Sequence, residues 1–220
     1  MRLAPACLAL LLGACAGGPM PPDWQLQSHG SLEKFRQQYL EGDSRAAARY
    51  FQEAKTSVAA TGRPELAARV ELYRCALGVA ALDVQACMEY ESLRADATAD
   101  DQAYGDFLAG RPGAAARLPE QYRDVAAARD NTARVKALES IADPVSRLVA
   151  AGALFRATQL PPQGVAIAVD AASSQGYRSP LLAFLGVQLR QAEAAGDRAA
   201  IEAIRKRIDL VYKSLPGHAP

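Results

Sequence analysis

Residues that end and restart helices recur at short intervals along this chain, between stretches rich in alanine. Gly42-Asp43 and Gly196-Asp197 each separate two such stretches, and Pro64 begins another. Glycine readily takes the left-handed conformation that ends a helix, aspartate caps the next helix, and proline suits a first helical turn. Alanine is the best helix former, and β-branched residues are sparse. The pattern predicts an all-α protein of roughly ten short helices.

Tight turns between short helices favour antiparallel helix pairs that stack on one another, either as a superhelix or as an irregular helical bundle. Apolar residues at helical spacing indicate which faces are buried. The clearest stripes lie in the second predicted helix and in the last one: Ala47, Phe51, Ala54 and Val58, and then Ile201, Ile204, Ile208 and Val211. Residues 181–189 are apolar almost all round, so this segment is expected near the centre of the domain.

The helical domain is expected to span 31–213. Glycine and proline interrupt the helical pattern between 94 and 119, which makes this segment a possible internal boundary. Three charged residues, Arg69, Glu71 and Arg74, lie between apolar positions of the third predicted helix. They either line a concave groove, if the helix pairs form a solenoid, or are ordinary surface charges.

A short apolar segment opens the chain, where one arginine precedes about ten mostly apolar residues, too few to span a bilayer. The segment ends in Leu12-Gly13-Ala14-Cys15. This arrangement resembles the signal peptide and lipobox of bacterial lipoproteins. The resemblance implies that 1–14 is removed, that the Cys15 thiol carries a diacylglyceryl group, and that its amino group is acylated, for example with palmitate. A buried core helix and an ordinary signal peptidase site are the alternatives.

The residues after Cys15 have the composition of a tether. The run 16–22 is rich in glycine and proline, which do not sustain a helix, so 15–30 is expected to link the lipid to the domain. By the same resemblance, Ala16 in place of aspartate implies sorting to the outer membrane, with the domain facing the periplasm. At the other end, 214–220 is expected to be a flexible tail.

Two of the four cysteines, Cys75 and Cys87, lie in the expected domain. They fall on consecutive predicted helices, at levels that differ by roughly 4 Å when counted from a turn near Asp83. An exported chain meets an oxidising compartment, so a disulfide between them is expected. Two buried thiols are the alternative. A catalytic redox role is disfavoured because the spacing is not C-x-x-C.

One segment carries a second family resemblance. Gly42, Ala47, Phe51 and Ala54 match the turn and second helix of the tetratricopeptide repeat. The preceding helix departs from that family, because the positions of its aromatic, leucine and glycine hold Ser31, Lys34 and Phe35. No period near 34 residues runs through the chain. The resemblance implies a helical-repeat scaffold, a class used mainly to bind proteins or peptides.

Composition and motifs give no catalytic, metal-binding or cofactor-binding residues. The chain has 25 basic and 24 acidic side chains, so it lacks the basic excess of a nucleic-acid-binding protein. The two histidines, His29 and His218, lie beside the tether and in the tail, where neither suits a nucleophile's base or a zinc site of three or four ligands. Neither an enzyme nor a metal protein is therefore predicted.

Two further residues leave alternatives open. Glu91, in Tyr90-Glu91-Ser92, faintly resembles the Glu-Ser pair of lytic transglycosylases, and is either a lone catalytic acid or a solvated helix-end glutamate. Arg147 follows Asp143 by four residues, and is either an anion-binding arginine or the partner of that carboxylate.

The sequence as a whole favours an outer-membrane-anchored lipoprotein that acts as a protein-binding scaffold or adaptor in envelope assembly. Its expected partners are the membrane, through the lipid, and a protein of the cell envelope. Confinement at a membrane raises the effective concentration of such an adaptor without new contacts. The alternatives are a peptidoglycan-acting enzyme that uses a lone carboxylate, and a structural lipoprotein without a defined partner.

Overall fold

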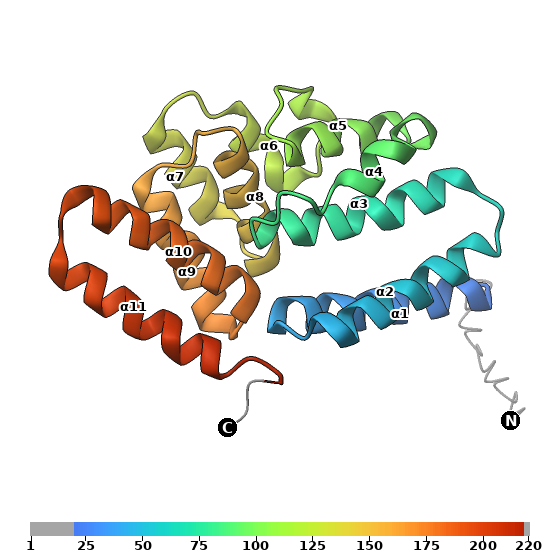
Figure 1. Cartoon of the computed structure of the whole chain (residues 1–220). Helices are drawn as coiled ribbons and strands as arrows, with labels where there is room; N and C mark the ends of the chain where they lie inside the picture. Colours follow the sequence, from blue (N-terminus) through green and yellow to red (C-terminus); the bar gives the residue numbers. More distant parts are fainter. Residues whose placement is uncertain (1–19, 218–220) are drawn as a thin grey trace, which may run out of the picture.

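A computed structural model describes residues 20–217, which contain eleven α-helices, two short 3-10 helices and no strand (Figure 1). The expected all-α architecture is therefore confirmed. The α-helices are α1 (Asp23–Glu41), α2 (Ser44–Ala59), α3 (Pro64–Ala80), α4 (Met88–Leu93), α5 (Ala99–Leu108), α6 (Glu120–Ala127), α7 (Asn131–Ser140), α8 (Pro144–Arg156), α9 (Pro162–Gln175), α10 (Arg178–Ala195) and α11 (Arg198–Lys213). The 3-10 helices are η1 (Arg94–Asp96) and η2 (Ala115–Arg117).

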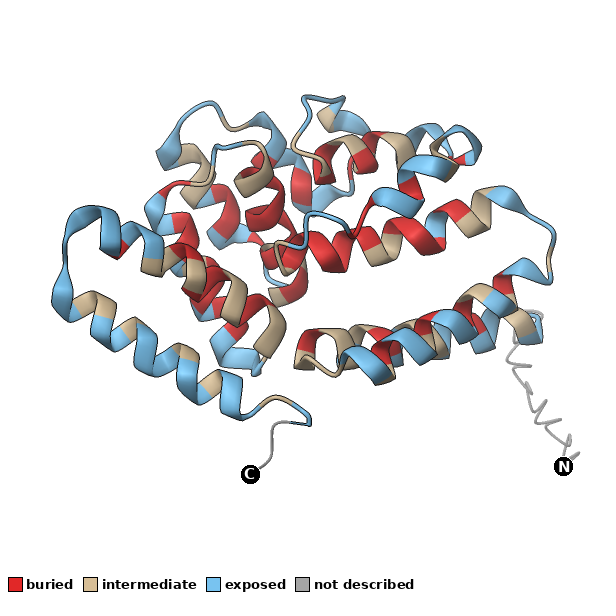
Figure 2. Cartoon of the chain, in the orientation of Figure 1, coloured by how far each residue is buried: buried red, intermediate tan, exposed pale blue. Residues whose placement is uncertain are grey.

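Helices α3, α8, α9 and α10 hold most of the buried side chains (Figure 2). The α1–α2 hairpin lies along one side of this core, the short helices α4 to α7 cover another, and α11 lies outermost against α10 (Figure 1). A single cluster of buried residues runs through both halves of the chain, and Phe107 and Leu108 of the 94–119 segment belong to it. Among the described residues, that segment is thus part of one common core.

Helices α3 and α8 cross at close range in the core. A Cβ atom on Gly152 would lie 2.0 Å from the backbone oxygen of Val79, so only glycine lets the two helices approach this closely. Val79 is fully buried, as are Ala150 and Ala151 beside the crossing. Small residues therefore set the distance between the two central helices.

The two predicted stripes differ in outcome. In α2 all four predicted residues are buried, and Asp43 caps the helix by accepting a hydrogen bond from Ala46 N at 2.9 Å. In α11 the predicted stripe is only partly buried, and no residue of the helix is fully buried. This helix packs mainly on α10, so its apolar face has one neighbouring helix in place of the two or more needed for full burial.

The helical part begins earlier than the sequence suggests. Helix α1 starts at Asp23, inside the range expected to be tether, and runs through Gly30 without interruption. Ser28 is buried and Trp24 packs partly against the core, which stabilises this first part of the helix. The proposed lipid site, Cys15, and the residues before it lie outside the described range. Among residues 20–217, no helix is both long and apolar enough to cross a membrane.

The start of the expected tail is docked on the domain. Leu215 Cδ2 lies 2.5 Å from the position that a Cβ atom would take on Gly42. Arg178, at the start of α10, donates from Nη1 to the backbone oxygen of Glu41 at 3.1 Å and from Nε to Ser214 Oγ at 3.2 Å. These contacts join the α1–α2 turn to the C-terminal end of α11.

Candidate functional site

A groove of about 520 Å³ lies between the α1–α2 hairpin and α3. We call it the hairpin groove. The residues that shape it come from all three helices: Phe35 and Tyr39 from α1, Phe51 and Lys55 from α2, and Glu71 and Arg74 from α3. The exposed side chains of Ala48, Gln52 and Glu89 line its rim. Its volume is in the range of known ligand sites.

Aromatic rings form the floor of the hairpin groove. Phe35 lies at the centre, with its ring centroid 4.9 Å from that of Phe51 and 5.5 Å from that of Tyr39. It also reaches the ring of Tyr73 in α3, at 6.4 Å. Phe35 therefore connects all three helices, and the offset and edge-on ring contacts stabilise their arrangement beyond simple burial.

A buried carboxylate sits between two cations on the wall of the groove. Glu71 is 2% exposed, and its two carboxylate oxygens lie 2.6 Å from Lys55 Nζ and 2.9 Å from Arg74 Nε. Both cations also lie over the ring of Phe51, at 5.8 and 5.3 Å from its centroid. One carboxylate offsets two cations, so this group of three carries a net positive charge beside an aromatic floor.

Tyr39 marks the end of the groove next to the α3–α4 loop. The pKa of Tyr39 is raised to about 12, mainly by burial; the nearby Asp83 carboxylate contributes to the increase and Arg74 opposes it. The phenol is thus held neutral over the usual pH range and remains a hydrogen-bond donor. This end of the groove is polar, whereas the floor is apolar.

The α3–α4 loop is fixed beside the groove by the predicted cysteine pair. The sulfur atoms of Cys75 and Cys87 lie at disulfide-bonding distance, 1.96 Å, with their Cα atoms 4.4 Å apart. The expectation that Cys87 lies on a helix is wrong, because 84–87 forms turns and α4 begins at Met88. Asp83 Oδ1 accepts from Gln85 N, two residues ahead, which favours a turn over a helix cap.

The charged residues predicted for a groove are only partly brought together. Glu71 and Arg74 line the hairpin groove, and Glu71 is too buried to be an ordinary surface charge. Arg69 points elsewhere and pairs with Asp101 at 2.9 Å. Lys55 was not expected to take part, since the sequence does not show that α2 crosses α3 at this level. The one signal in the sequence is an acidic residue between Val70 and Leu72.

The structure shows the surroundings of two further residues named in the sequence analysis, Arg147 and Glu91. Arg147 does not pair with Asp143. Its guanidinium donates from Nε and Nη2 to the backbone oxygen of Ile141 at 3.0 and 2.6 Å, so it caps the end of α7. The Asp143 carboxylate instead accepts from Ser146 N. Glu91 is exposed and paired with Arg111 at 2.9 Å, whereas a glycosidic acid needs an apolar cleft.

Of the remaining candidates from the sequence, only His29 lies among the described residues. Leu12, Gly13, Ala14 and Cys15 fall outside the described residues, as does His218, and His29 is exposed on α1. Within residues 20–217, no group of three His, Cys, Asp or Glu side chains is arranged to hold a metal ion.

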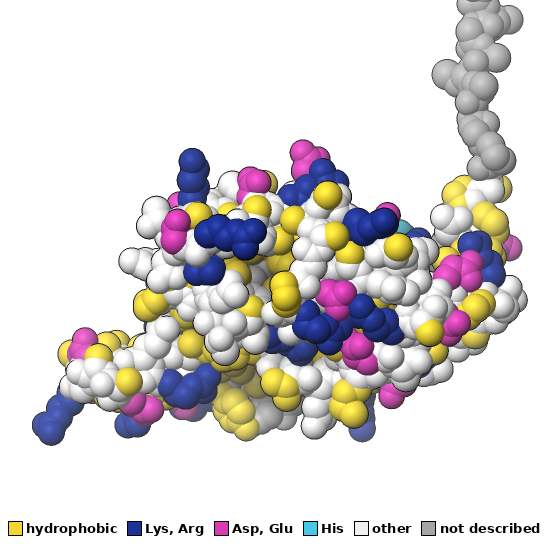
Figure 3. Space-filling view, turned by 90° about the horizontal axis from the view of Figure 1, so that it is seen from above, with side chains coloured by type: hydrophobic (Ala, Val, Ile, Leu, Met, Phe, Trp, Pro, Cys, Tyr) yellow, Lys and Arg dark blue, Asp and Glu magenta, His cyan; other side chains and the backbone are white. Residues whose placement is uncertain are grey.

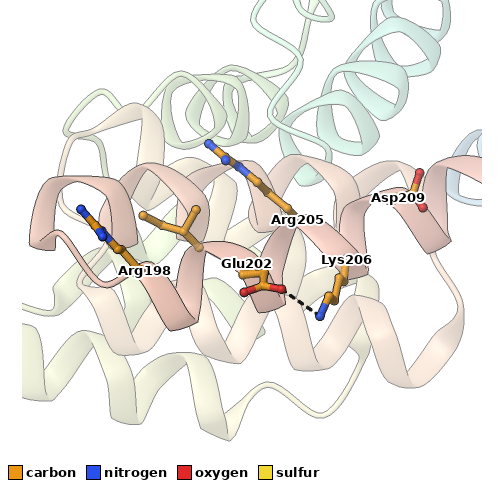
Figure 4. Close-up of a pocket in the computed structure, with 6 residues that line it drawn as sticks. Arg198, Glu202, Arg205, Lys206 and Asp209 are labelled. Atoms are coloured by element: carbon orange, nitrogen blue, oxygen red, sulfur yellow. Dashed lines mark ion pairs between the residues drawn. The ribbon is translucent and has the colours of Figure 1, made fainter.

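A second hollow lies on the outer surface of α11 (Figure 4). Its walls are long side chains of this helix alone, among them Arg198, Arg205 and the ion pair of Glu202 with Lys206 at 3.1 Å. Both members of that pair are 73% exposed. Because no second element of the described chain closes it, the hollow offers little enclosed surface for a ligand, and the hairpin groove is the better candidate.

No protein-family model, curated protein or solved structure matches the chain.

Proposed function

We propose that this protein is an outer-membrane lipoprotein, anchored through Cys15, that holds a segment of another envelope protein in the hairpin groove. The observation that carries the proposal is the groove itself, with its aromatic floor beside the Lys55–Glu71–Arg74 group. Such a surface suits a segment that has an apolar side chain next to a carboxylate. The groove includes Ala47 and Phe51, two of the residues that resemble the tetratricopeptide repeat.

The position of α1 supports a tethered scaffold. Helix α1 starts at Asp23, so only a short stretch of chain would separate the lipid from the folded domain. A stretch this short keeps the domain close to the membrane surface. The groove, which α1 helps to form, would then lie within reach of proteins on the same membrane, and confinement would raise its effective concentration toward them.

The anchor and the groove are tested separately. In cells fed a fatty-acid analogue, Cys15→Ala is expected to abolish labelling of the protein, and unchanged labelling would overturn the anchor. For the groove, a photo-crosslinking residue at Gln52 in the full lipidated chain is expected to give a discrete adduct in intact envelopes. Moving the probe to Lys206, on the outer surface of α11, is expected to remove the adduct.

Substitutions in α2 give the matched control. Ala48→Trp fills the groove from an exposed position and is expected to abolish the Gln52 adduct, whereas Arg45→Trp adds the same side chain outside the groove and is expected to preserve it. An adduct that persists in Ala48→Trp, or disappears equally in Arg45→Trp, would argue that the groove is not the binding surface.

A further inference from the structure

A third cavity, separate from the hairpin groove and from the hollow on α11, is lined by a different set of side chains. It has a volume of about 560 Å³ and lies between the end of α5 with its following loop, the α6–α7 turn and the end of α8. Its floor is apolar and includes Phe107, Leu118, Val125 and Leu154. Three arginines, Arg111, Arg129 and Arg134, line it together with this floor, and we call it the arginine pocket. Figure 3 faces the side of α5 to α7 and shows basic side chains interspersed with hydrophobic ones.

The wall formed by the loop after α5 is held in place by the fold. Gly110 has a φ of +70°, and a Cβ atom there would lie 2.5 Å from the backbone nitrogen of Ala157 at the end of α8. Arg111, the next residue, donates to Asp106 Oδ1 at 2.8 Å and to Glu91 Oε1 at 2.9 Å. The wall is therefore set without a ligand, which lowers the entropic cost of binding.

Unlike Arg111, the other two arginines of the pocket pair with no carboxylate among the described residues. Arg134 donates only to neutral groups, Asn131 Oδ1 at 3.2 Å and Gln159 Oε1 at 2.9 Å, and its Nε is buried without a hydrogen-bond partner among the described residues. Arg129 is exposed and forms no ion pair within residues 20–217. Among residues 20–217, no acidic side chain lines the arginine pocket. A buried donor without a partner beside an apolar cavity is a position that an anion would satisfy.

The local charge and the lining define the class of that anion. Asp130 caps α7 by accepting from Ala133 N at 2.8 Å and lies between the two uncompensated arginines in sequence, so the three residues leave one positive charge. Apart from the arginines, Gln159 is the lining side chain that forms hydrogen bonds, and it already accepts from Arg134. The polar side chains of the lining are thus the three arginines and Gln159.

We propose that the arginine pocket binds an aliphatic monocarboxylate of the fatty-acid type. The carboxylate pairs with Arg134, whose planar guanidinium suits two parallel hydrogen bonds, and with Arg129 at the opening. The alkyl chain covers the floor formed by Phe107, Leu118 and Leu154. A peptide chain fits less well, because its backbone amides would find few side-chain partners in this lining. The proposal is independent of the hairpin groove.

The test uses the full chain with Cys15→Ala, so that no attached lipid competes, and octanoate as the probe. Methyl resonances of Leu118, Val125 and Leu154 are expected to shift with octanoate and to give its dissociation constant. Octan-1-ol, which lacks the charge, is expected to bind at least about tenfold more weakly. Tight binding of octan-1-ol, or tighter binding of a short peptide with a free C-terminal leucine, would overturn the assignment.

Two pairs of variants separate charge from folding. Arg134→Gln is expected to weaken octanoate binding at least about tenfold, while Arg198→Gln on α11 leaves it unchanged. Ala127 is exposed and lines the pocket, so Ala127→Glu places a repelling carboxylate there without disturbing the core. It is expected to weaken binding about tenfold, whereas the neutral Ala127→Gln changes it less than about threefold. Equal binding by Ala127→Glu and Ala127→Gln would overturn the proposal even if Arg134→Gln failed to fold.

Discussion

Gly152 of α8 faces the backbone oxygen of Val79 in α3 so closely that a Cβ atom on the glycine would lie 2.0 Å from that oxygen. The obstacle is backbone near the C-terminal end of a central helix, and backbone does not move aside as a flexible side chain would. Because both helices belong to the common core, their spacing affects every element packed on them.

Gly152→Ala is therefore expected to destabilise the protein by about 1–3 kcal/mol or more, the cost of overpacking a core. Gly186→Ala in α10 is the matched control, because a Cβ atom there meets nothing within 4 Å. Alanine is the better helix former, so this control is expected to be neutral or to stabilise by up to about 1 kcal/mol. Urea unfolding of both variants gives the comparison, and equal losses of stability would contradict the proposed role of Gly152.

The Lys55–Glu71 pair is expected to contribute much more than an exposed ion pair. Glu71 is 2% exposed, so removing one partner leaves a poorly solvated charge, and a coupling of about 1–3 kcal/mol is expected in a double-mutant cycle of Lys55→Met with Glu71→Gln. For Lys206 and Glu202, both 73% exposed, the same cycle is expected to give about 0.5 kcal/mol or less. Similar coupling energies in the two cycles would show that burial does not strengthen the pair.

Removing the link between Cys75 and Cys87 is expected to cost about 2–3 kcal/mol, the value for a short closed loop. The double variant Cys75→Ala, Cys87→Ala should unfold at lower urea concentration than the oxidised protein. Mass spectrometry of the intact, non-reduced chain should find neither thiol free to alkylation. Alkylation of both cysteines without prior reduction would contradict the disulfide.

Stability is expected to fall at alkaline pH. Burial is the largest cause that raises the pKa of Tyr39, Tyr73 and Tyr90 from 10.0 to about 12. A tyrosine with a raised folded-state pKa favours folding below pH 10, and this contribution is lost as the pH rises from about 10 to about 12. In that window, each tyrosine lowers the free energy of unfolding by up to about 1.4 kcal/mol per pH unit.

Urea unfolding at pH 8, 10 and 11 measures this dependence, and tyrosinate absorbance follows the ionisation directly. Tyr39→Phe removes one ionisable group and is expected to reduce the slope above pH 10. A free energy of unfolding that stays constant up to pH 11 would contradict the raised pKa values of these tyrosines.

The parts of the fold that follow from local chemistry were predictable from the sequence. The α2 stripe and the Asp43 cap both depend on residues a few positions apart, and both are present. The start of α1 was not predictable, because Gly30 resembles a helix end and only tertiary packing of Trp24 and Ser28 stabilises the turns before it.

The candidate sites depend on longer-range contacts. Lys55 and Glu71 lie on different helices, and their pairing requires the angle at which α2 meets α3, which periodicity does not specify. Arg147 shows the same effect within a shorter span. Its expected partner, Asp143, caps α8 by accepting from Ser146 N, and Arg147 donates to the backbone oxygen of Ile141 instead. The position of that backbone oxygen depends on how α7 ends, which the spacing of the two side chains in the sequence does not specify.

The hydrogen bond from Arg178 to the backbone oxygen of Glu41 joins residues 137 positions apart. Contacts of this kind form late, because the chain between them must first be ordered. The α1–α2 hairpin is synthesised before α10 and α11, so its packing is complete only when those two helices are in place. A ribosome that still held the C-terminal segment would leave the α1–α2 turn without these contacts, and a chain truncated before α10 would keep it so.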